Sequence, residues 1–164
     1  MSNSSNEFIK LLKHPVKFRM FLFYKLPAAF FSGVRIRSID ESKCTTSVPY
    51  KWLTQNPFKS TYFASLAMAA ELSTGALGLS HIYKRKPSIS MLVVKMEANY
   101  FKKAIGKTYF TCEAGQQIRE TIEAAIATGE GKLISVKTIG ANEAGEIVAE
   151  FLFTWSFKAK QTKT

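Results

Sequence analysis

The sequence predicts an α+β domain, in which an antiparallel sheet packs against one long apolar helix. Residues 60–80 carry one charged side chain, Glu71, among Ala, Gly, Ser, Thr, Leu, Met and aromatic residues. Ala, Leu and Met favour helix, and so few charges indicate a helix that is buried on nearly all sides. Several other segments alternate apolar and polar residues with the period of two that half-buried strands show. Strands joined by hairpins that bury one face on such a helix form the α+β layer arrangement.

The N-terminal part, residues 6–31, is predicted to be helical, basic and apolar. Phenylalanines and leucines recur at helical spacing with lysines between them, and Pro15 and Pro27 divide the segment into pieces. Two interpretations of this extension stay open. It packs against the main domain, or it lies on a membrane surface with its apolar side among anionic lipids.

The strands and the second helix follow from the period of the apolar residues. Strands are expected over residues 34–39, 43–50, 88–101, 107–114, 132–139 and 147–157, the first two forming a hairpin or one long strand. Residues 116–128 have a helical period and end before Gly129, which is typical of a helix C-terminus. The chain thus divides into an N-terminal helical extension (1–31), the α+β domain (32–158) and a tail (159–164).

The long helix has two candidate starts. Asn56 followed by Pro57 fits an N-cap with proline at the first helical position, and Ser60 is the second candidate. Glu71, near the middle, has two interpretations as well. It is either the point at which the helix reaches water, or a desolvated carboxylate with a functional role. A membrane span is not expected, because Glu71 and several glycine and hydroxyl residues interrupt the apolar run.

Composition and charge exclude several classes of protein. With 46% hydrophobic and 21% charged residues, the 164-residue chain is a globular domain rather than a disordered one. Its net charge of +11 favours anionic partners, but the basic residues are scattered, so nucleic-acid binding is not expected. Cys44 and Cys112 are far apart and lack metal-ligand spacing, so neither a disulfide scaffold nor a metal site is expected. No segment has the pattern of a signal peptide, which favours a cytoplasmic location.

Short motifs around the long helix resemble a known family. Asn56 precedes Glu71 by fifteen positions, residues 71–75 read ELSTG, and residues 145–157 read GEIVAEFLFTWSF. This pattern, over residues 30–157, is similar to that of the hotdog-fold thioesterase superfamily, of the phenylacetate-pathway and acyl-CoA thioesterase type, and in particular to an uncharacterised thioesterase-like branch. The resemblance implies an antiparallel sheet wrapped around the central helix. It also implies a homodimer or tetramer with continuous sheets, in which both chains contribute to a site at the subunit interface.

The start of the helix departs from the family's pattern. Where the relatives carry His-Gly-Gly, this chain carries Tyr62-Phe63-Ala64. The family uses a backbone N–H there to polarise the thioester carbonyl. Phe63 and Ala64 keep that N–H and the same helix dipole, but they leave less room for close approach of a substrate.

The resemblance implies roles for particular residues. Glu71 is the expected general base or nucleophile, and the amides of Phe63 and Ala64 are the expected oxyanion hole. Asn56 is expected to orient water or substrate, or alternatively only to cap the helix. The expected substrate-binding residues, among which the basic ones hold the phosphates of coenzyme A, are Tyr62, Ser88, Ser90, Lys84, Arg85, Lys86, Lys102 and Lys103.

These expectations favour one function and leave one alternative. The chain is expected to be a thioesterase that hydrolyses a fatty or aryl acyl-CoA and needs no cofactor besides the coenzyme A of its substrate. The alternative, which the Tyr62-Phe63-Ala64 departure favours, is a non-catalytic hotdog module that binds acyl-CoA or a fatty acyl ligand. Neither His14 nor His81 has the position of the active-site histidine of hotdog dehydratases, so dehydration is not expected.

Overall fold

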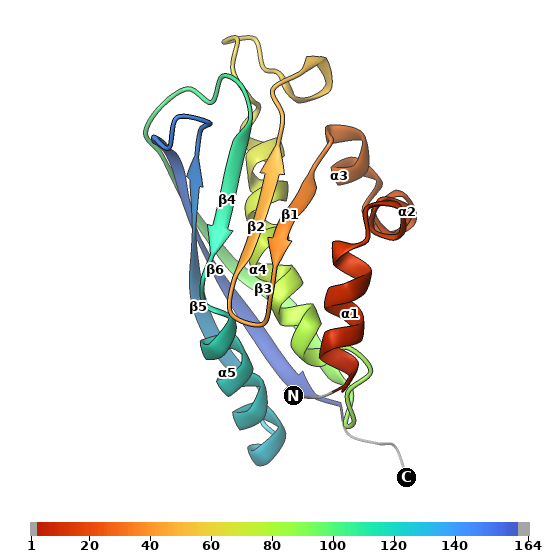
Figure 1. Cartoon of the computed structure of the whole chain (residues 1–164). Coiled ribbons are helices and arrows are strands. Elements are labelled where there is room, and N and C mark those ends of the chain that lie inside the picture. The colour runs from red at the N-terminus through yellow and green to blue at the C-terminus, as the bar shows by residue number, and fades with distance from the viewer. Residues whose placement is uncertain (1–2, 161–164) are drawn as a thin grey trace.

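The computed structural model describes residues 3–160 and contains one six-stranded antiparallel sheet with helices packed against it (Figure 1). The helices are α1 (Asn3–Lys13), α2 (Pro15–Lys25), α3 (Pro27–Ser32), α4 (Phe63–Ile82) and α5 (Gly115–Thr128), with a short 3-10 helix, η1 (Trp52–Thr54). The strands are β1 (Arg35–Ile39), β2 (Cys44–Val48), β3 (Ile89–Tyr100), β4 (Thr108–Cys112), β5 (Lys132–Ala141) and β6 (Ile147–Ala159). Their order in the sheet is β1-β2-β4-β5-β6-β3. The predicted α+β class is confirmed.

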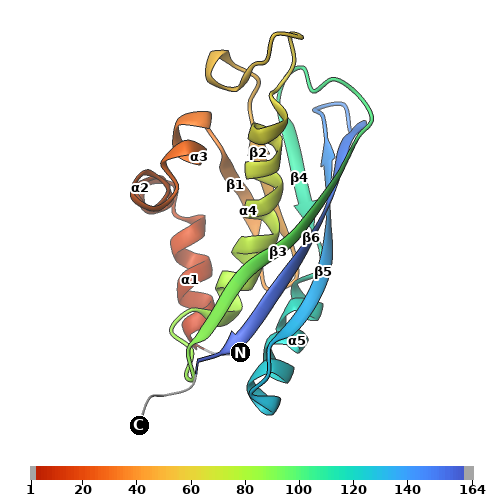
Figure 2. The same ribbon diagram turned by 180° about the vertical axis from the view of Figure 1, so that it is seen from behind.

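Helix α4 is the centre of the fold. The sheet curves around it, with β1 and β2 passing on one side of the helix and β3 on the other (Figures 1 and 2). Thirteen of its twenty residues are buried, as the nearly uncharged sequence predicts. Strand side chains come close to the helix backbone at Gly78, where a Cβ would lie 2.5 Å from the Met91 Cε and 3.4 Å from the Phe157 Cζ. Burial on all sides therefore depends on Ala, Ser and Gly at the contacts with the sheet.

Hydroxyl groups help to join α4 to strands β2 and β5. The Thr46 Oγ1 of β2 donates a hydrogen bond to the Ala69 carbonyl of α4, at 2.6 Å. Farther along the helix, the Ser73 Oγ lies 2.8 Å from the Thr138 Oγ1 of β5. All four residues are fully buried, so these bonds satisfy polar groups that water cannot reach.

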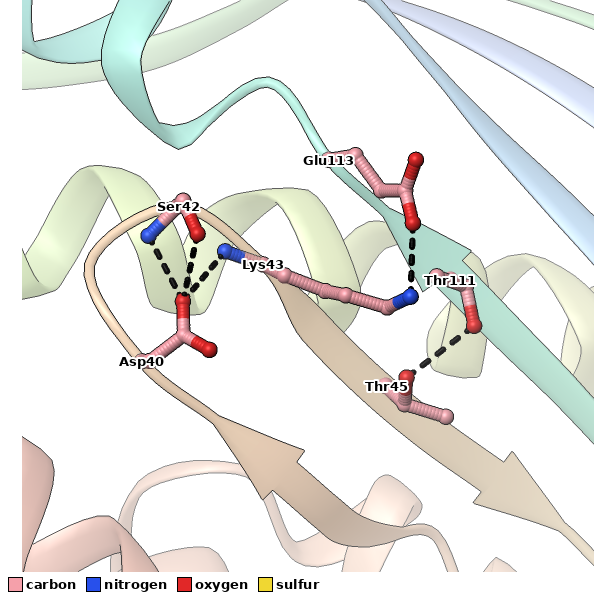
Figure 3. A network of polar contacts seen from close by, with 6 residues as sticks. All are labelled: Asp40, Ser42, Lys43, Thr45, Thr111 and Glu113. Atoms are coloured by element: carbon pink, nitrogen blue, oxygen red, sulfur yellow. Dashed lines mark hydrogen bonds and ion pairs between the residues drawn. The ribbon is translucent and has the colours of Figure 1, made fainter.

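The first hairpin is closed by the side chain of Asp40. Its Oδ1 accepts hydrogen bonds from the Ser42 amide, the Ser42 hydroxyl and the Lys43 amide, each at 2.8 Å (Figure 3). These bonds, from the Ser42 hydroxyl first, lower the pKa of Asp40. Residues 34–50 therefore form a hairpin, β1 and β2, rather than one long strand.

Side chains also hold β2 next to β4. The Lys43 Nζ forms an ion pair with Glu113 at 2.6 Å, and the hydroxyls of Thr45 and Thr111 lie 3.0 Å apart (Figure 3). Both contacts lie on the outer side of the sheet and agree with the register that pairs Thr45 with Thr111. The ion pair is exposed, so it contributes at most about 1 kcal/mol.

Two predicted boundaries are wrong. Helix α4 begins at Phe63, with Tyr62 as its N-cap residue, and not at Asn56 or Ser60. The preceding residues form a turn closed by a bridge between Gln55 and Thr61, so the proline after Asn56 begins a turn and not a helix. The last strand continues through residue 159, and residues 161–164 of the predicted tail lie outside the described part of the chain. The division into extension, domain and tail stays a prediction.

The N-terminal helices pack against the domain through one side. Phe8 and Leu12 of α1 are buried, and the Phe8 ring stacks on Tyr83 with centroids 4.7 Å apart. Phe18 and Leu22 of α2 are also buried. Packing of the extension on the domain is therefore part of this fold, while the outer side of α2 and α3 stays exposed.

Gly115, the first residue of α5, is predicted to tolerate no side chain. A Cβ at this position would overlap the Glu41 carbonyl oxygen and lie 2.6 Å from the Ser42 Cα, both of them backbone atoms of the first hairpin turn. We expect Gly115→Ala to lower the free energy of unfolding by about 1–3 kcal/mol or more, the usual cost of overpacking. Gly131→Ala is the control, since its nearest neighbour would be the Lys158 Cδ at 4.0 Å. Equal denaturant midpoints for the two variants would contradict this packing.

Candidate active site

Glu71 lies on α4 beside an apolar cavity of about 330 Å³. The walls come from α1, α2, α4, β3 and β6, and their side chains include Phe8, Phe21, Met91 and Trp155. Among the described residues that line the cavity, Lys25 is the only other one with a charge. The middle of the central helix therefore presents one carboxyl group to a space of the size and polarity that apolar ligands occupy.

Gly75 leaves the space in which the carboxyl group lies. A Cβ at Gly75 would be 2.9 Å from the Glu71 Oε1 and 3.4 Å from the Trp155 ring. The indole is held in turn, because its Nε1 donates to the Thr74 Oγ1 at 3.0 Å. The Thr74 hydroxyl then donates to the Glu71 backbone carbonyl at 2.9 Å. Gly75 therefore lies next to both the Glu71 carboxyl group and the Trp155 ring.

The carboxyl group of Glu71 has no polar partner. Within residues 3–160, no hydrogen bond or ion pair is formed with it, although the side chain is partly buried. Burial disfavours the charged form and raises the pKa of Glu71 above its ordinary value. A carboxyl group of this kind binds a proton more readily than an exposed one, which suits a general base that works near neutral pH.

The start of α4 presents free backbone donors. The hydrogen bonds of the first turn begin with the Ser65 and Leu66 amides, which both donate to the Tyr62 carbonyl. The amides of Phe63 and Ala64 have no partner in the described part of the chain, as expected for the first residues of a helix. A second groove, of about 590 Å³, adjoins this end of the helix. It is lined in part by Asn56, Tyr62, Phe63, Lys102 and Lys103.

Asn56 closes the turn that precedes the helix. Its Oδ1 accepts from the Phe58 amide at 3.0 Å and from the Ser60 amide and hydroxyl at 3.2 Å each. The alternative that Asn56 caps the helix is wrong, because Tyr62 is the N-cap residue. The Nδ2 has no partner among the described residues, so it is free to donate to a ligand in the second groove.

The predicted base and the predicted oxyanion donors do not meet within one chain. Glu71 and Phe63 are eight residues apart on α4, which is about 12 Å along a helix axis. The two residues also line different spaces, Glu71 the apolar cavity and Phe63 the second groove. A single chain therefore holds the two halves of the predicted site separately.

The predicted binders of coenzyme A also divide into two groups. Lys84 and Arg85 follow the C-terminal end of α4 and form exposed ion pairs with Glu7 and Glu123, at 3.0 and 2.6 Å. Lys86, Ser88 and Ser90 are exposed at the same end, before and at the start of β3. Lys102, which pairs with Glu146 at 2.5 Å, and Lys103 lie by the second groove at the other end. Twenty helical residues span about 30 Å, so one chain does not bring both groups to one ligand.

Sequence reasoning missed the residues that close the cavity over Glu71. Phe8, Phe21 and Lys25 come from α1 and α2, which lie before the residues that the resemblance covers. The phenylalanines at helical spacing indicated a buried side for these helices, but not which residue of α4 they would cover. Trp155, in the last strand, is buried.

Neither metal ligands nor a catalytic histidine lie near Glu71. Within the described residues, no three side chains of His, Cys, Asp or Glu are grouped in a way that could hold a metal ion. His81 is buried against α5, and its Nε2 lies 3.2 Å from the Glu41 carbonyl. Burial lowers the pKa of His81, so the neutral ring is favoured.

Comparison with known proteins agrees with this architecture. Residues 17–157 match the model of a domain family described as a domain of unknown function, DUF4442. A search of the curated proteins gives no match. The chain is similar to the solved structure of PA5026 from Pseudomonas aeruginosa, described as a probable thioesterase, with a TM-score of 0.74 and 22% identity over 89% of this chain and 97% of that one.

Two further structures have the same fold. OLEI01261 from Chlorobaculum tepidum, of unknown function, gives a TM-score of 0.78 at 16% identity and covers 97% of this chain and 99% of its own. PaaI from the phenylacetic acid degradation operon of Escherichia coli gives 0.65 at 12% identity, covering 99% and 100%. The predicted hotdog fold is confirmed. The chain belongs to the DUF4442 family and has the hotdog fold, with α4 as its central helix.

Proposed function

We propose that this protein hydrolyses acyl-CoA thioesters and that Glu71 is the general base or the nucleophile. The observation that carries the proposal is the carboxyl group of Glu71, unpartnered and partly desolvated beside an apolar cavity. A fatty or aryl acyl group fits the cavity, which would leave its thioester carbonyl near the carboxyl group. The likeness to PA5026, described as a probable thioesterase, supports the same class of reaction.

The chemistry requires little beyond this group. As a base, the Glu71 carboxylate takes a proton from water while the water oxygen bonds to the carbonyl carbon; the C–S bond then breaks, and coenzyme A leaves as the thiol with the proton that Glu71 took. As a nucleophile, the Glu71 carboxylate attacks the carbonyl carbon, the C–S bond breaks and the coenzyme A thiolate leaves, and water hydrolyses the resulting anhydride to the free acid and the Glu71 carboxylate. Either route places negative charge on the carbonyl oxygen, which free helix N-terminal amides stabilise. No metal or other cofactor takes part in either route.

A homodimer would bring the two halves of the site together. Strand β3 is at one edge of the sheet, runs for twelve residues and has no partner on its outer side in the described chain. Leu92 and Val94 on this strand are 62% and 49% exposed. Long, apolar edge strands pair with another chain. Pairing of β3 with its copy would make the sheets continuous and would let the Phe63 and Ala64 amides of one subunit serve Glu71 of the other.

Coenzyme A would then bind near the second groove. Lys102 and Lys103 lie beside the free amides, so they are the proposed partners of its phosphates. Lys84, Arg85 and Lys86 lie at the other end of α4, near Ser88 and Ser90. In a dimer, these residues of the other subunit remain candidates for binding coenzyme A. The cytoplasm is the proposed location of the protein and of its acyl-CoA substrates.

A non-catalytic module that binds acyl-CoA or a fatty acyl ligand is the second candidate. The aromatic rings of Tyr62 and Phe63 pack edge to face at the start of α4, with centroids 4.7 Å apart. The Phe63 ring takes up room where the relatives have glycine, next to the amides that would stabilise the oxyanion. Tight binding of acyl-CoA without release of free thiol would favour this candidate.

Glu71→Gln tests the proposal most simply. We expect the purified protein to release free thiol from a panel of fatty and aryl acyl-CoA substrates, and the variant to lose roughly 10²–10⁴-fold in kcat, because glutamine cannot accept the proton or attack. Glu130→Gln is the matched control, since Glu130 is exposed in a loop and pairs only with Lys132. Circular dichroism checks that Glu71→Gln is folded. Unchanged turnover in the folded variant would contradict the assignment of Glu71 as general base or nucleophile.

Two substitutions of Asn56 separate its structural role from a catalytic one. Asn56→Asp keeps an oxygen for the three donors of the turn but loses the Nδ2 donor, whereas Asn56→Ala loses both. If Nδ2 orients substrate, both variants lose about tenfold or more in kcat/KM, while only Asn56→Ala loses stability, by about 1–3 kcal/mol. Wild-type kcat/KM in Asn56→Asp would limit Asn56 to the turn. Thiol release and thermal melting measure the two effects.

A further inference from the structure

The outer face of α2 and α3 is apolar and exposed. Its large side chains, here called the α2–α3 patch, are Val16, Met20, Phe23, Tyr24, Leu26 and Phe31, which are between 39% and 72% exposed. The opposite side of α2 is already buried in the domain through Phe18 and Leu22. In both views α2 lies at the margin of the molecule, away from the sheet (Figures 1 and 2). A helix that is apolar on both sides has more apolar surface than its packing in this chain requires.

The patch contains a shallow groove with one cation in it. The groove measures about 410 Å³ and is lined by residues of α2, including Pro15, and by Phe30 of α3. Arg19 is the one charged side chain among these described lining residues. Its guanidinium lies 3.8 Å from the centre of the Phe30 ring, and its Nη1 donates to the Phe30 carbonyl at 3.3 Å. The cation is therefore held in a fixed place next to exposed apolar side chains.

The segment of the chain that carries the patch has charges of one sign. Residues 8–39 contain seven lysines and arginines and no aspartate or glutamate. None of the seven takes part in an ion pair between described residues. Burial and, to a smaller extent, the charge of Arg35 lower the pKa of Arg19. Such a surface is complementary to a ligand that is both anionic and apolar.

We propose that the α2–α3 patch binds the surface of a bilayer that contains anionic phospholipids. Phosphate head groups would pair with Arg19, Lys17 and Lys13, while the apolar side chains enter the boundary between head groups and acyl chains. Attachment at the surface also fits the length of the helices, because no helix within residues 3–160 is long and apolar enough to cross a membrane. A bilayer with anionic lipids is complementary to both the apolar area and the positive charge of the patch.

The patch adjoins the cavity beside Glu71. Lys25 and Leu26, at the end of α2, line that cavity, and Leu26 also belongs to the patch. Docking would thus bring one wall of the cavity to the lipid surface. The binding inference does not depend on the proposed hydrolase activity, because its evidence is the exposed surface alone.

Vesicle co-sedimentation of the full chain tests the proposal. We expect the protein to sediment with vesicles of phosphatidylcholine mixed with phosphatidylglycerol and far less with phosphatidylcholine alone, and binding to weaken as salt is added. Lys13→Gln and Lys17→Gln should each weaken binding about fivefold, the contribution of one cation near an anionic surface. The variant V16S/M20S/Y24S should abolish sedimentation. All five positions are exposed, so these changes leave the core intact.

Matched controls come from exposed residues elsewhere. Ile105→Ser and Lys158→Gln remove an apolar and a basic side chain distant in sequence from the patch and should sediment as the unaltered protein does. The proposal is overturned if the unaltered protein ignores anionic vesicles, or if the controls weaken binding as much as the patch variants. It is also overturned if V16S/M20S/Y24S converts an oligomer to a monomer in sedimentation velocity without changing vesicle binding, because the patch would then be a contact between copies of this chain.

Discussion

The burial of α4 inside the curved sheet is the constraint on which the rest of the structure depends. A helix enclosed on nearly all sides has to be made of small and apolar residues, and its few polar groups need partners within the fold. Hydroxyl bonds such as those of Thr46 and Ser73 supply those partners. Strand side chains come close to the helix backbone at small residues such as Gly78. Under this constraint a charged side chain in the middle of α4 is costly, and Glu71 is the one that remains.

The effect of Glu71 on the free energy of unfolding depends on pH in a definite direction. Because burial raises the pKa of Glu71 in the folded state, the folded protein binds this proton more tightly than the unfolded chain does. Glu71 therefore lowers the free energy of unfolding as pH rises from its unfolded pKa through its folded pKa, and the loss persists above that range. A group that opposes folding at neutral pH and has no partner is more readily explained by chemistry in the adjoining cavity than by stability.

The sequence was sufficient for the parts of the fold that depend on local pattern. The uncharged run around Glu71 predicted the buried helix, and the period of two predicted all six strands. Both predictions were possible because burial of one or both faces of an element determines which of its residues are apolar. The start of α4 was misplaced because Asn56-Pro57 has the composition of a helix start but closes a turn instead. The contact of the N-terminal helices with Glu71, and the separation of Glu71 from Phe63, depend on tertiary packing, which no local pattern records.

The most direct test of the account is the pKa of Glu71, measured by 13C NMR of the side-chain carboxyl groups in glutamate-labelled protein. Glu71→Gln identifies the signal by its disappearance. A desolvated carboxyl group without a partner titrates clearly above the ordinary glutamate value of 4.5. Titration at or below that value would mean that Glu71 is solvated or paired, and the reason for assigning chemistry to this cavity would be lost.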